Sequence, residues 1–516
     1  MRRIISTVVM TVMLTMLIML FMTAGTAGET QMDADGQWEY KLDNGSAVIT
    51  GYRVEPTENL TIPNELDGYP VTGIGNRAFA EYSALTGITF PDSLISIGDQ
   101  AFRNCSSLTS IILPNSLTSI GEAAFMWNDS LTDITLPDGL MSISDYMFSG
   151  CSALTHITLP DSLQSIGDEA FISCAALTAI TIPENVTEIG VFSFARCDSL
   201  ACINTATENT VYASIDGVLF DKVQKMLVAY PAGRFGTIYQ VPQGIRSIGE
   251  AAFFECNTLT HITLPDSLAS VGDRAFFECS SLTDITLPDG LVSIGECAFG
   301  RCSSLTEITL PDGLVSIGDW AFGGCGSLTN ITLPDNITSI GEGAFSDCSS
   351  LTGIIWPDNI TSIGDWTFSE CSSLIDVILP ENLRSIGKGA FQECSSLIGI
   401  TLPNSLISIG DSAFYECSSL TDIILPDGIT SIGNWMFWEC SSLIEIILPD
   451  GITSIGNWVF QGCSSLTHIT LPDSLTFIGK GAFKECGDDL ILTVSEGSYA
   501  VQYAKENGIR YTPVFD

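Results

Sequence analysis

One short unit recurs along most of this 516-residue chain. Prolines fall at a constant interval over 91–183 and again over 242–472, and phenylalanines keep the same interval over 79–194 and 253–483. The two phenylalanine runs have six and eleven members, so the sequence contains seventeen units. Fixed self-similarity of this kind is the signature of a repeat architecture, in which each unit packs only against its neighbours. It predicts one continuous solenoid, whereas length alone would suggest three or four domains.

The unit at 282–302 shows how the first half of one turn of such a solenoid can form. Leu282, Ile285 and Leu287 have the L-x-x-L-x-L spacing of a leucine-rich repeat strand. The interval between units, about 23 residues, also falls within the range of that repeat class. Pro288 cannot donate a hydrogen bond to a β-ladder, so we expect it to end the strand.

The second half of the same unit supplies the other side of the turn. Gly295 lets the chain bend into a short helical turn, from which Ala298 and Phe299 point into the core. One unit cannot bury its apolar side chains alone, but stacked units can. We therefore predict a leucine-rich-repeat solenoid of the right-handed α/β type, with a parallel β-ladder on one side and short helical turns on the other.

The units resemble the BspA-like leucine-rich repeats, which carry the pattern I-G-x-x-A-F-x-x-C-x-x-L-x-x-I-x-L-P. Residues 317–334 have this pattern. Residues 62–75 are similar to the usual N-terminal segment of that family, and residues 497–509 to its C-terminal cap. The resemblance covers roughly residues 38–516 and implies the leucine-rich-repeat fold. It also implies an exported or surface-associated protein, and some members of the family act as adhesins for host matrix proteins or other cells.

The repeat pauses once, in a segment whose charge is neutral, and two runs there, 214–220 and 226–230, indicate strands. This island is either a degenerate repeat that extends the sheet, which we favour, or a partner-binding segment. The predicted organisation is a signal peptide at 1–27, an N-terminal cap segment at 28–73, repeats at 74–202, a hairpin-like island at 203–241, repeats at 242–486 and a C-terminal cap at 487–516.

The N-terminus has the order of a secretory signal. Arg2 and Arg3 precede an uncharged apolar run at 4–22, and small residues follow at 23–28. We predict cleavage after Ala27, although the run is also long enough to serve as an uncleaved membrane anchor. The mature protein is expected to be soluble, to have no transmembrane segment, and to be either secreted or held at the cell surface.

The chain is strongly acidic, with 60 Asp and Glu against 19 Lys and Arg and a net charge of −41. Nucleic acid is not an expected partner, because its phosphates require clustered Lys and Arg. The carboxylates form three stripes, one after the proline, one after the repeat glycine and one before the cysteine. Such regular stripes indicate a solvated face that keeps an apolar-cored rod soluble, and we expect a monomer.

Fifteen of the seventeen cysteines lie three residues after the repeat phenylalanine, and only Cys202 and Cys297 lie elsewhere. Export would favour disulfides, but stacked side chains at one position have parallel Cβ vectors that do not converge on a bond. We therefore predict a ladder of buried thiols that behave as small apolar groups. Disulfides between neighbouring units are the alternative. Zinc is disfavoured, because neither a C-x-x-C motif nor a histidine pair accompanies these cysteines.

The sequence has little material for catalysis. His156, His261 and His468 share one outward strand position and are several units apart, so they cannot cooperate in a catalytic group. The carboxylate stripes lack the pairs with divergent environments that acid–base catalysis uses. No catalytic, metal-binding or cofactor-binding residue is predicted, no cofactor is implied, and we do not expect an enzyme.

One set of exposed apolar residues on the ladder face is a candidate for partner binding. Outward positions that are mostly threonine in the first half of the chain become isoleucine in later units. Such a patch has the size of an interaction site, although exchange among β-branched residues would also produce it. Its members are Ile355, Ile375, Ile378, Ile398, Ile424, Ile444 and Ile447.

A second candidate set lies on the turn side, two residues before the repeat phenylalanine. Tryptophan at this position could stack on a sugar or on a partner protein, but packing between adjacent turns would also explain it. Its members are Trp320, Trp366, Trp435 and Trp458.

The combined features predict an exported leucine-rich-repeat binding protein that mediates adhesion or protein–protein interaction at the cell surface. Its partner would be a protein or a cell-surface polymer whose identity the sequence does not reveal. The alternative is a structural spacer or surface coat without a specific ligand.

Overall fold

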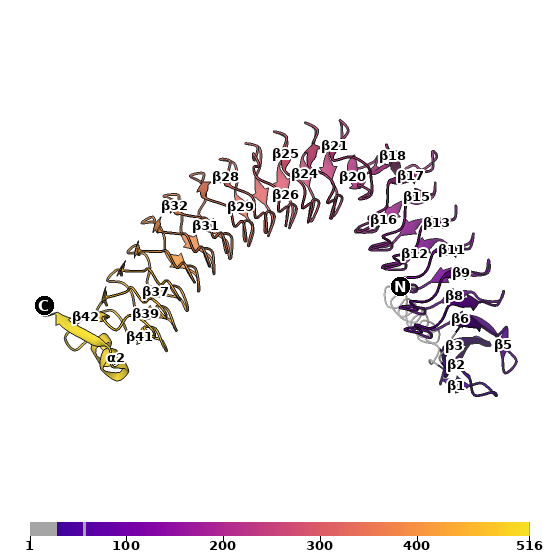
Figure 1. Ribbon diagram of the computed structural model, residues 1–516, viewed down its shortest axis with the longest axis horizontal. Helices are drawn as coiled ribbons and strands as arrows, with labels where there is room; N and C mark the ends of the chain where they lie inside the picture. Colours follow the sequence, from indigo (N-terminus) through magenta and orange to yellow (C-terminus); the bar gives the residue numbers. More distant parts are fainter. Residues whose placement is uncertain (1–27, 55–57, 515–516) are drawn as a thin grey trace, which may run out of the picture. The chain divides into compact units, whose positions relative to one another are not determined.

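The computed structural model describes residues 28–54 and 58–514 (Figure 1). The predicted signal peptide lies outside the described residues. The chain forms two compact units that divide between Val211 and Tyr212, and each unit is a solenoid of stacked turns. The predicted leucine-rich-repeat solenoid is therefore confirmed. The single array expected from the repeat is divided in two, because the non-repeat island interrupts the constant interval.

Each regular turn contributes two short strands, except the turn after β26, in which residues 307–309 form no strand. In the unit at 282–302, β25 (Asp284–Thr286) belongs to a first ladder and β26 (Ser293–Ile294) to a second ladder across the turn. Both strands pair in parallel with the same position one turn away, as Ile262 does with Ile285 in the first ladder. The sequence does not predict the second ladder, because a strand of two residues is too short to show an alternating pattern.

In the first unit, a cap of mostly antiparallel strands precedes the regular turns. The cap leads into the second ladder, because β6 pairs in parallel with β3 and with β8. The cap strands are β1 (Gln31–Met32), β2 (Trp38–Asp43), β3 (Ser46–Tyr52), β5 (Glu65–Leu66) and β6 (Tyr69–Ile74). The first-ladder strands are β4 (Asn59–Thr61), β7 (Gly87–Thr89), β9 (Ser110–Ile112), β11 (Asp133–Thr135), β13 (His156–Thr158), β15 (Ala179–Ile182) and β17 (Cys202–Thr205). The second-ladder strands are β8 (Ser96–Ile97), β10 (Ser119–Ile120), β12 (Ser142–Ile143), β14 (Ser165–Ile166) and β16 (Glu188–Ile189).

In the second unit the same two ladders run up to a C-terminal cap. The first-ladder strands are β21 (Ile238–Gln240), β23 (His261–Thr263), β25, β28 (Asn330–Thr332), β30 (Gly353–Ile355), β32 (Asp376–Ile378), β34 (Gly399–Thr401), β36 (Asp422–Ile424), β38 (Glu445–Ile447) and β40 (His468–Thr470). The second-ladder strands are β22 (Ser247–Ile248), β24 (Ser270–Val271), β26, β27 (Ser316–Ile317), β29 (Ser339–Ile340), β31 (Ser362–Ile363), β33 (Ser385–Ile386), β35 (Ser408–Ile409), β37 (Ser431–Ile432), β39 (Ser454–Ile455) and β41 (Phe477–Ile478). The cap consists of β42 (Ile491–Ser495), α2 (Tyr499–Asn507) and β43 (Arg510–Val514), and α2 is the one helix within 28–54 and 58–514.

The island contains three antiparallel strands, β18 (Tyr212–Ile215), β19 (Val218–Asp221) and β20 (Met226–Ala229). Asp216 and Gly217 join the first two with φ of 50° and 81°, as a two-residue hairpin turn requires. The prediction of one strand over 214–220 is therefore wrong. Because β20 then pairs in parallel with β22, the island extends the second ladder, as favoured above.

The segment around the repeat phenylalanine is a pair of tight turns, in place of the short helical turn that the sequence suggests. The residues two before and two after the phenylalanine have left-handed backbone, with φ of 52° at Cys297 and 57° at Arg301. We call these positions the leading slot and the trailing slot. Their N–H groups donate to carbonyls of the next turn, as Cys297 does to Asp319 at 2.8 Å. The left-handed residues thus direct hydrogen bonds between turns and away from a helix.

The repeat phenylalanines form a buried stack within each unit. The rings of Phe299 and Phe322, for example, lie with centroids 5.3 Å apart and planes 2° from parallel. A lone turn would leave both faces of its ring in water, whereas each neighbour covers one face. This burial explains why the turns are stable only as an array.

The cysteines form a second ladder beside this stack. Cys302 Sγ donates to the carbonyl oxygen of Phe276 at 3.1 Å, and the same bond recurs in both units. In one of the two turns without a ladder cysteine, Asn128 Nδ2 donates to the equivalent carbonyl of Phe102 at 3.0 Å. All seventeen cysteines are free, and those of the ladder are buried except the half-buried Cys486. The predicted ladder of buried thiols is confirmed.

Candidate functional site

All seven candidate isoleucines lie at the surface of the second unit and are 44–80% exposed. They form two columns along the first ladder, which we call the isoleucine patch. One column holds the last residues of β30, β32, β36 and β38, where Ile424 pairs with Ile447 on the next strand. The other column holds the residues that directly precede β32, β34 and β38, where the N–H of Ile398 donates to the carbonyl of Ile375 at 2.9 Å.

The charged side chains between these columns are carboxylates. Asp376, Asp422 and Glu445 are the exposed first residues of β32, β36 and β38. No Lys or Arg occurs in the strands of this part of the ladder or directly before any of them; these strands are β30, β32, β34, β36 and β38. The patch is therefore apolar and acidic, which suits a partner surface that is apolar and basic.

The four candidate tryptophans occupy the leading slot, with φ of 51–54°. Three of them cover a glycine in the same slot of the next turn, and a Cβ added at Gly343 would lie 2.7 Å from ring atoms of Trp320. The fourth, Trp435, stacks on Trp458 with ring centroids 5.6 Å apart and planes 11° from parallel. Packing between adjacent turns thus explains where the rings sit, and Trp320 still remains 42% exposed.

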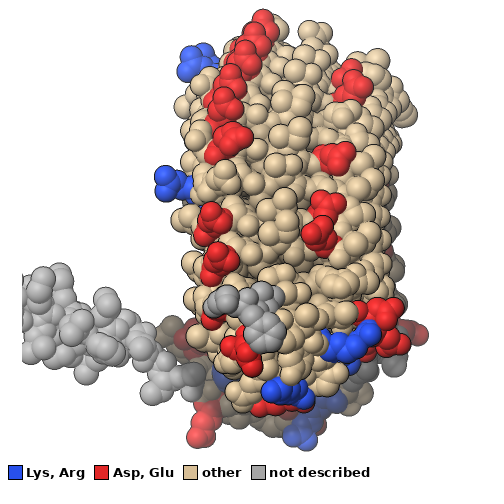
Figure 2. Space-filling view, turned by 90° about the vertical axis from the view of Figure 1, so that its left-hand side faces the viewer, with Lys and Arg blue, Asp and Glu red and all other residues tan. Residues whose placement is uncertain are grey.

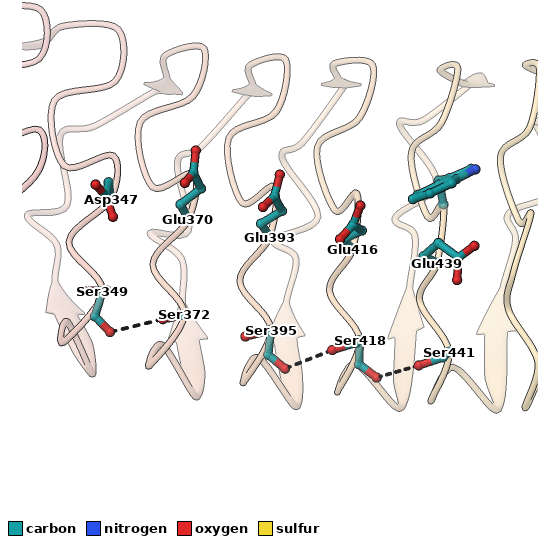
Figure 3. Close-up of a pocket in the computed structure, with 11 residues that line it drawn as sticks. Asp347, Ser349, Glu370, Ser372, Glu393, Ser395, Glu416, Ser418, Glu439 and Ser441 are labelled. Atoms are coloured by element: carbon teal, nitrogen blue, oxygen red, sulfur yellow. Dashed lines mark hydrogen bonds between the residues drawn. The ribbon is translucent and has the colours of Figure 1, made fainter. Parts of the chain in front are cut away.

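Carboxylates gather in rows on the surface, as Figure 2 shows for one face. One row lines a groove of about 640 Å³ on the turn side of the second unit, and a row of serines lies beside it (Figure 3). We call this the acid–serine groove. Its carboxylates occupy the trailing slots, and its serines follow two residues later; they are Asp347, Glu370, Glu393, Glu416 and Glu439, and Ser349, Ser372, Ser395, Ser418 and Ser441.

The acid–serine groove concentrates negative charge. Burial and then the charges of Glu393 and Asp347 raise the pKa of Glu370 above its ordinary value. The serines serve the backbone, since Ser418 Oγ donates to the carbonyl of Ser395 at 3.4 Å. The sequence shows this carboxylate stripe, but its interpretation as a uniformly solvated face misses the groove.

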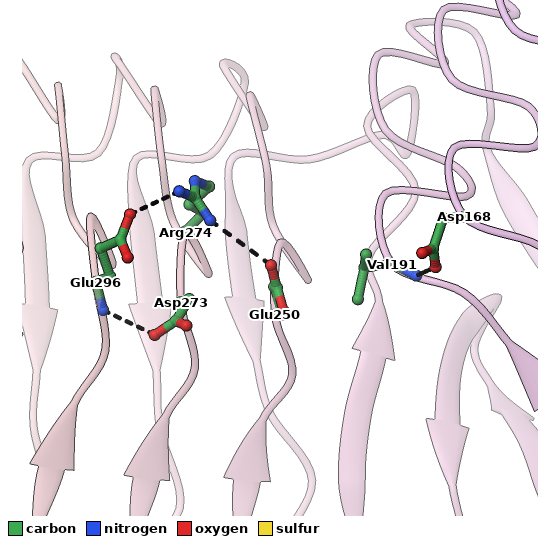
Figure 4. Close-up of polar contacts among 6 residues, drawn as sticks. All are labelled: Asp168, Val191, Glu250, Asp273, Arg274 and Glu296. Carbon is green, nitrogen blue, oxygen red and sulfur yellow. Dashed lines mark hydrogen bonds and ion pairs between the residues drawn. The ribbon is translucent and has the colours of Figure 1, made fainter. Parts of the chain in front are cut away.

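The stripe that follows the repeat glycine has a structural role. In the second unit, Asp273 Oδ1 accepts the backbone N–H of Glu296 at 2.8 Å, and in the first unit Asp168 Oδ1 accepts that of Val191 at 2.8 Å (Figure 4). Arg274 adds an ion pair to the Glu296 carboxylate at 2.6 Å. Each such Asp ties its turn to the next, which explains its recurrence without any ligand.

Potential metal ligands are spread over many turns. Within 28–54 and 58–514, no group of three or more His, Cys, Asp or Glu side chains is placed to hold a metal ion. His156, His261 and His468 lie on the separate strands β13, β23 and β40. The described part of the chain has no helix of the length and apolarity that crossing a membrane requires.

Known proteins share this architecture. The family described as BspA type leucine rich repeat region matches residues 72–201, 237–322, 292–398 and 385–497. A leucine rich cell surface protein from Faecalibacterium prausnitzii is 31% identical over 69% of this chain and 95% of its own, with a TM-score of 0.53. A leucine-rich repeat protein from Bacteroides ovatus is 27% identical over 93% of this chain and 98% of its own, with a TM-score of 0.43. No curated protein matches the chain. The family match spans most of the sequence, and the chain therefore belongs to the BspA-type leucine-rich repeat family.

Proposed function

We propose that this protein is exported and acts at the cell surface as a binding protein whose isoleucine patch captures a partner protein, for adhesion or another protein–protein interaction. Membership of a leucine-rich repeat family supports a role in binding, because this fold presents a long repetitive surface. The similar protein from Faecalibacterium prausnitzii is described as a cell surface protein. The secretory order of residues 1–28 supports export.

The observation that carries the proposal is the exposure of seven isoleucines on adjacent turns. Full burial of one isoleucine side chain contributes about 1.5–3 kcal/mol. Because the seven isoleucines are 44–80% exposed, covering one contributes roughly half of this. Covering all seven would therefore offset much of the cost of association, which is about 4–15 kcal/mol. Contiguous exposed apolar surface on a chain this acidic is costly unless a partner covers it.

The charges around the patch indicate what kind of partner fits. Asp376, Asp422 and Glu445 lie between the two isoleucine columns and would pair with Lys or Arg side chains. A second copy of this chain would bring the same carboxylates together, at a net charge of −41 per copy. We therefore expect a different protein, with an apolar and basic surface.

A triple variant of the mature chain tests the proposal. Ile378→Asp, Ile424→Asp and Ile447→Asp, combined, add three charges to one isoleucine column and should lower capture of the cognate partner at least tenfold. The immobilised protein is exposed to surface-protein extracts of neighbouring or host cells, and the bound proteins are quantified by mass spectrometry. Circular dichroism checks that the variant folds.

The first unit offers a matched control at the same strand position. Ile112→Asp, Thr135→Asp and Thr158→Asp, combined, add the same three charges to the exposed last residues of β9, β11 and β13. This control variant should capture the partner as the native chain does. Equal losses in both triple variants would show that general acidity, and not the isoleucine patch, governs binding.

The spacer remains the second candidate, because much of the surface serves to join turns. Thr283 Oγ1, for example, donates to the carbonyl of Thr260 on the previous turn at 3.1 Å. A spacer requires that neither triple variant changes adhesion, while deletion of whole repeat units shortens the reach of whatever the chain displays.

A further inference from the structure

The position directly after the repeat phenylalanine is small in four consecutive turns of the second unit, at Gly300, Gly323, Ser346 and Ser369. The turns on either side have the larger Phe277 and Gln392 there. The missing side-chain volume leaves a groove of about 600 Å³, and Phe277 and Gln392 are among the residues that line it. We call this groove the trough.

The trough has an aromatic wall and a charged wall. The aromatic wall consists of the leading-slot residues Trp320 and Trp366. The charged wall includes the trailing-slot residues Asp347 and Glu370. Arg301 also lines the trough, but its guanidinium is paired at 2.7 Å with the trailing-slot glutamate of the preceding turn. The charge left for a ligand is therefore negative.

Two serine side chains lie in the floor of the trough. Ser346 and Ser369 are each 4% exposed, and both line the groove. A hydroxyl can donate and accept hydrogen bonds, so these two serines can bond polar groups of a ligand.

The negative field continues beyond the trough. Asp347 and Glu370 also line the acid–serine groove, so the charged wall runs on through Glu393, Glu416 and Glu439. No Lys or Arg is among the residues that line the acid–serine groove. A ligand that follows this wall experiences one sign of charge over several turns, which favours a polycation.

We propose that the trough binds an extended lysine- or arginine-rich segment of a partner protein. A cationic side chain would lie against the indole of Trp320, because the Trp366 ring already has Lys388 Nζ 5.3 Å from its centroid. The cationic side chains would pair with the carboxylates of Asp347 and Glu370. Backbone groups of the segment would bond the hydroxyls of the two floor serines. Four turns at about 4.8 Å each accommodate about six residues of extended chain.

This site is independent of the isoleucine patch, which lies on the ladder face. The test uses the mature chain and a fluorescein-labelled hexapeptide that alternates lysine and glycine, with binding followed by fluorescence anisotropy. A hexapeptide with glutamate in place of lysine and an unlabelled neutral hexaose are the other two arms. The lysine peptide should bind saturably and more weakly as salt is added, and the glutamate peptide and the hexaose should neither bind nor compete.

Two variants alter the trough in different ways. Ser346→Tyr with Ser369→Tyr fills the floor with a residue that Tyr415 already provides at the same position of a native turn, so the fold should accept it. Asp347→Asn with Glu370→Gln removes the charge at nearly constant shape. Each pair should weaken lysine-peptide binding at least tenfold.

A matched control removes the same two charges from the same two turns, through Asp335→Asn with Asp358→Asn in the stripe after the proline. It should change binding less than twofold. Equal weakening in the control, unchanged binding after the floor is filled, absence of lysine-peptide binding, or binding of the hexaose instead would each overturn the proposal. The combined patch variant, Ile378→Asp, Ile424→Asp and Ile447→Asp, should bind the peptide normally, so that failure of the patch and failure of the trough are distinguishable.

Discussion

Raising the pH should unfold the cysteine ladder cooperatively. Burial raises the pKa of Cys279 and of Cys325 to about 12, and it raises that of Cys302 between them well above its ordinary value. A thiol in the unfolded chain ionises near pH 8.5. Between about pH 8.5 and pH 12 the unfolded chain therefore binds fewer protons than the folded one, and stability falls as the pH rises.

The magnitude follows from the number of thiols that open together. Above about pH 8.5, each buried thiol lowers the free energy of unfolding by about 1.4 kcal/mol per pH unit, as long as its folded pKa exceeds the pH. Three turns that open together, those of Cys279, Cys302 and Cys325, would lose about 4 kcal/mol per pH unit, or about 8 kcal/mol by pH 10.5. That loss is comparable to the whole stability of an ordinary domain.

The assay is urea unfolding under reducing conditions, followed by far-UV circular dichroism from neutral pH to about pH 10.5. Cys279→Ala, Cys302→Ala and Cys325→Ala, combined, form the comparison. This variant should be less stable at neutral pH, because it loses buried sulfur atoms, but its midpoint should fall less steeply with pH. Tyrosines titrate in both proteins and cancel. The same pH dependence in both would refute the assignment of the effect to buried thiols.

The remaining predictions concern single turns and use urea unfolding at neutral pH. Gly343→Ala should cost about 1–2 kcal/mol more in the native chain than beside Trp320→Ala, because the added Cβ occupies the space of the indole, whereas the strain of alanine at a φ of 58° is the same in both backgrounds. Equal costs in the two backgrounds would argue against packing between turns. Asp273→Ala should cost about 1 kcal/mol, since the N–H of the next turn loses its acceptor, whereas Asp289→Ala should cost less than about 0.5 kcal/mol. Indistinguishable costs for these two would mean that the Asp ladder does not stabilise the fold. Asn128→Ala should cost about 1–3 kcal/mol, because two buried carbonyls lose their hydrogen-bond donor. Asn128→Cys should recover part of this stability by restoring the thiol hydrogen bond. No recovery would contradict the role given to that bond.

The constant repeat interval was sufficient to predict the solenoid, because one packing solution repeated in register satisfies every turn. The local path of each turn was less predictable. A non-glycine residue with left-handed backbone is uncommon. The residue types Cys297 and Arg301 therefore do not predict their φ of 52° and 57°. Neighbouring turns stabilise that conformation through hydrogen bonds that the sequence of one turn does not show.

Exposure of the candidate residues was more predictable than their surroundings. Strand alternation placed Ile378 and Ile424 outward, and the structure leaves both exposed. The position of the Trp320 ring depends on the absence of a Cβ at Gly343, which belongs to the next turn. Its packing can therefore be predicted only by comparing neighbouring turns. The trough was missed for the same reason, because no single small residue such as Gly323 produces a groove.

Recurrence has an unusual meaning in this protein. Residues that return in many turns, such as the aspartates represented by Asp273 and the thiols represented by Cys302, bond the neighbouring turn and are accounted for by the fold. In a nearest-neighbour array, outward side chains can change without disturbing the core. A binding site for a ligand longer than one turn therefore requires side chains that differ from the repeat pattern on several consecutive turns. Isoleucine in place of threonine on the ladder face and small residues in place of bulky ones along the trough are both departures of this kind.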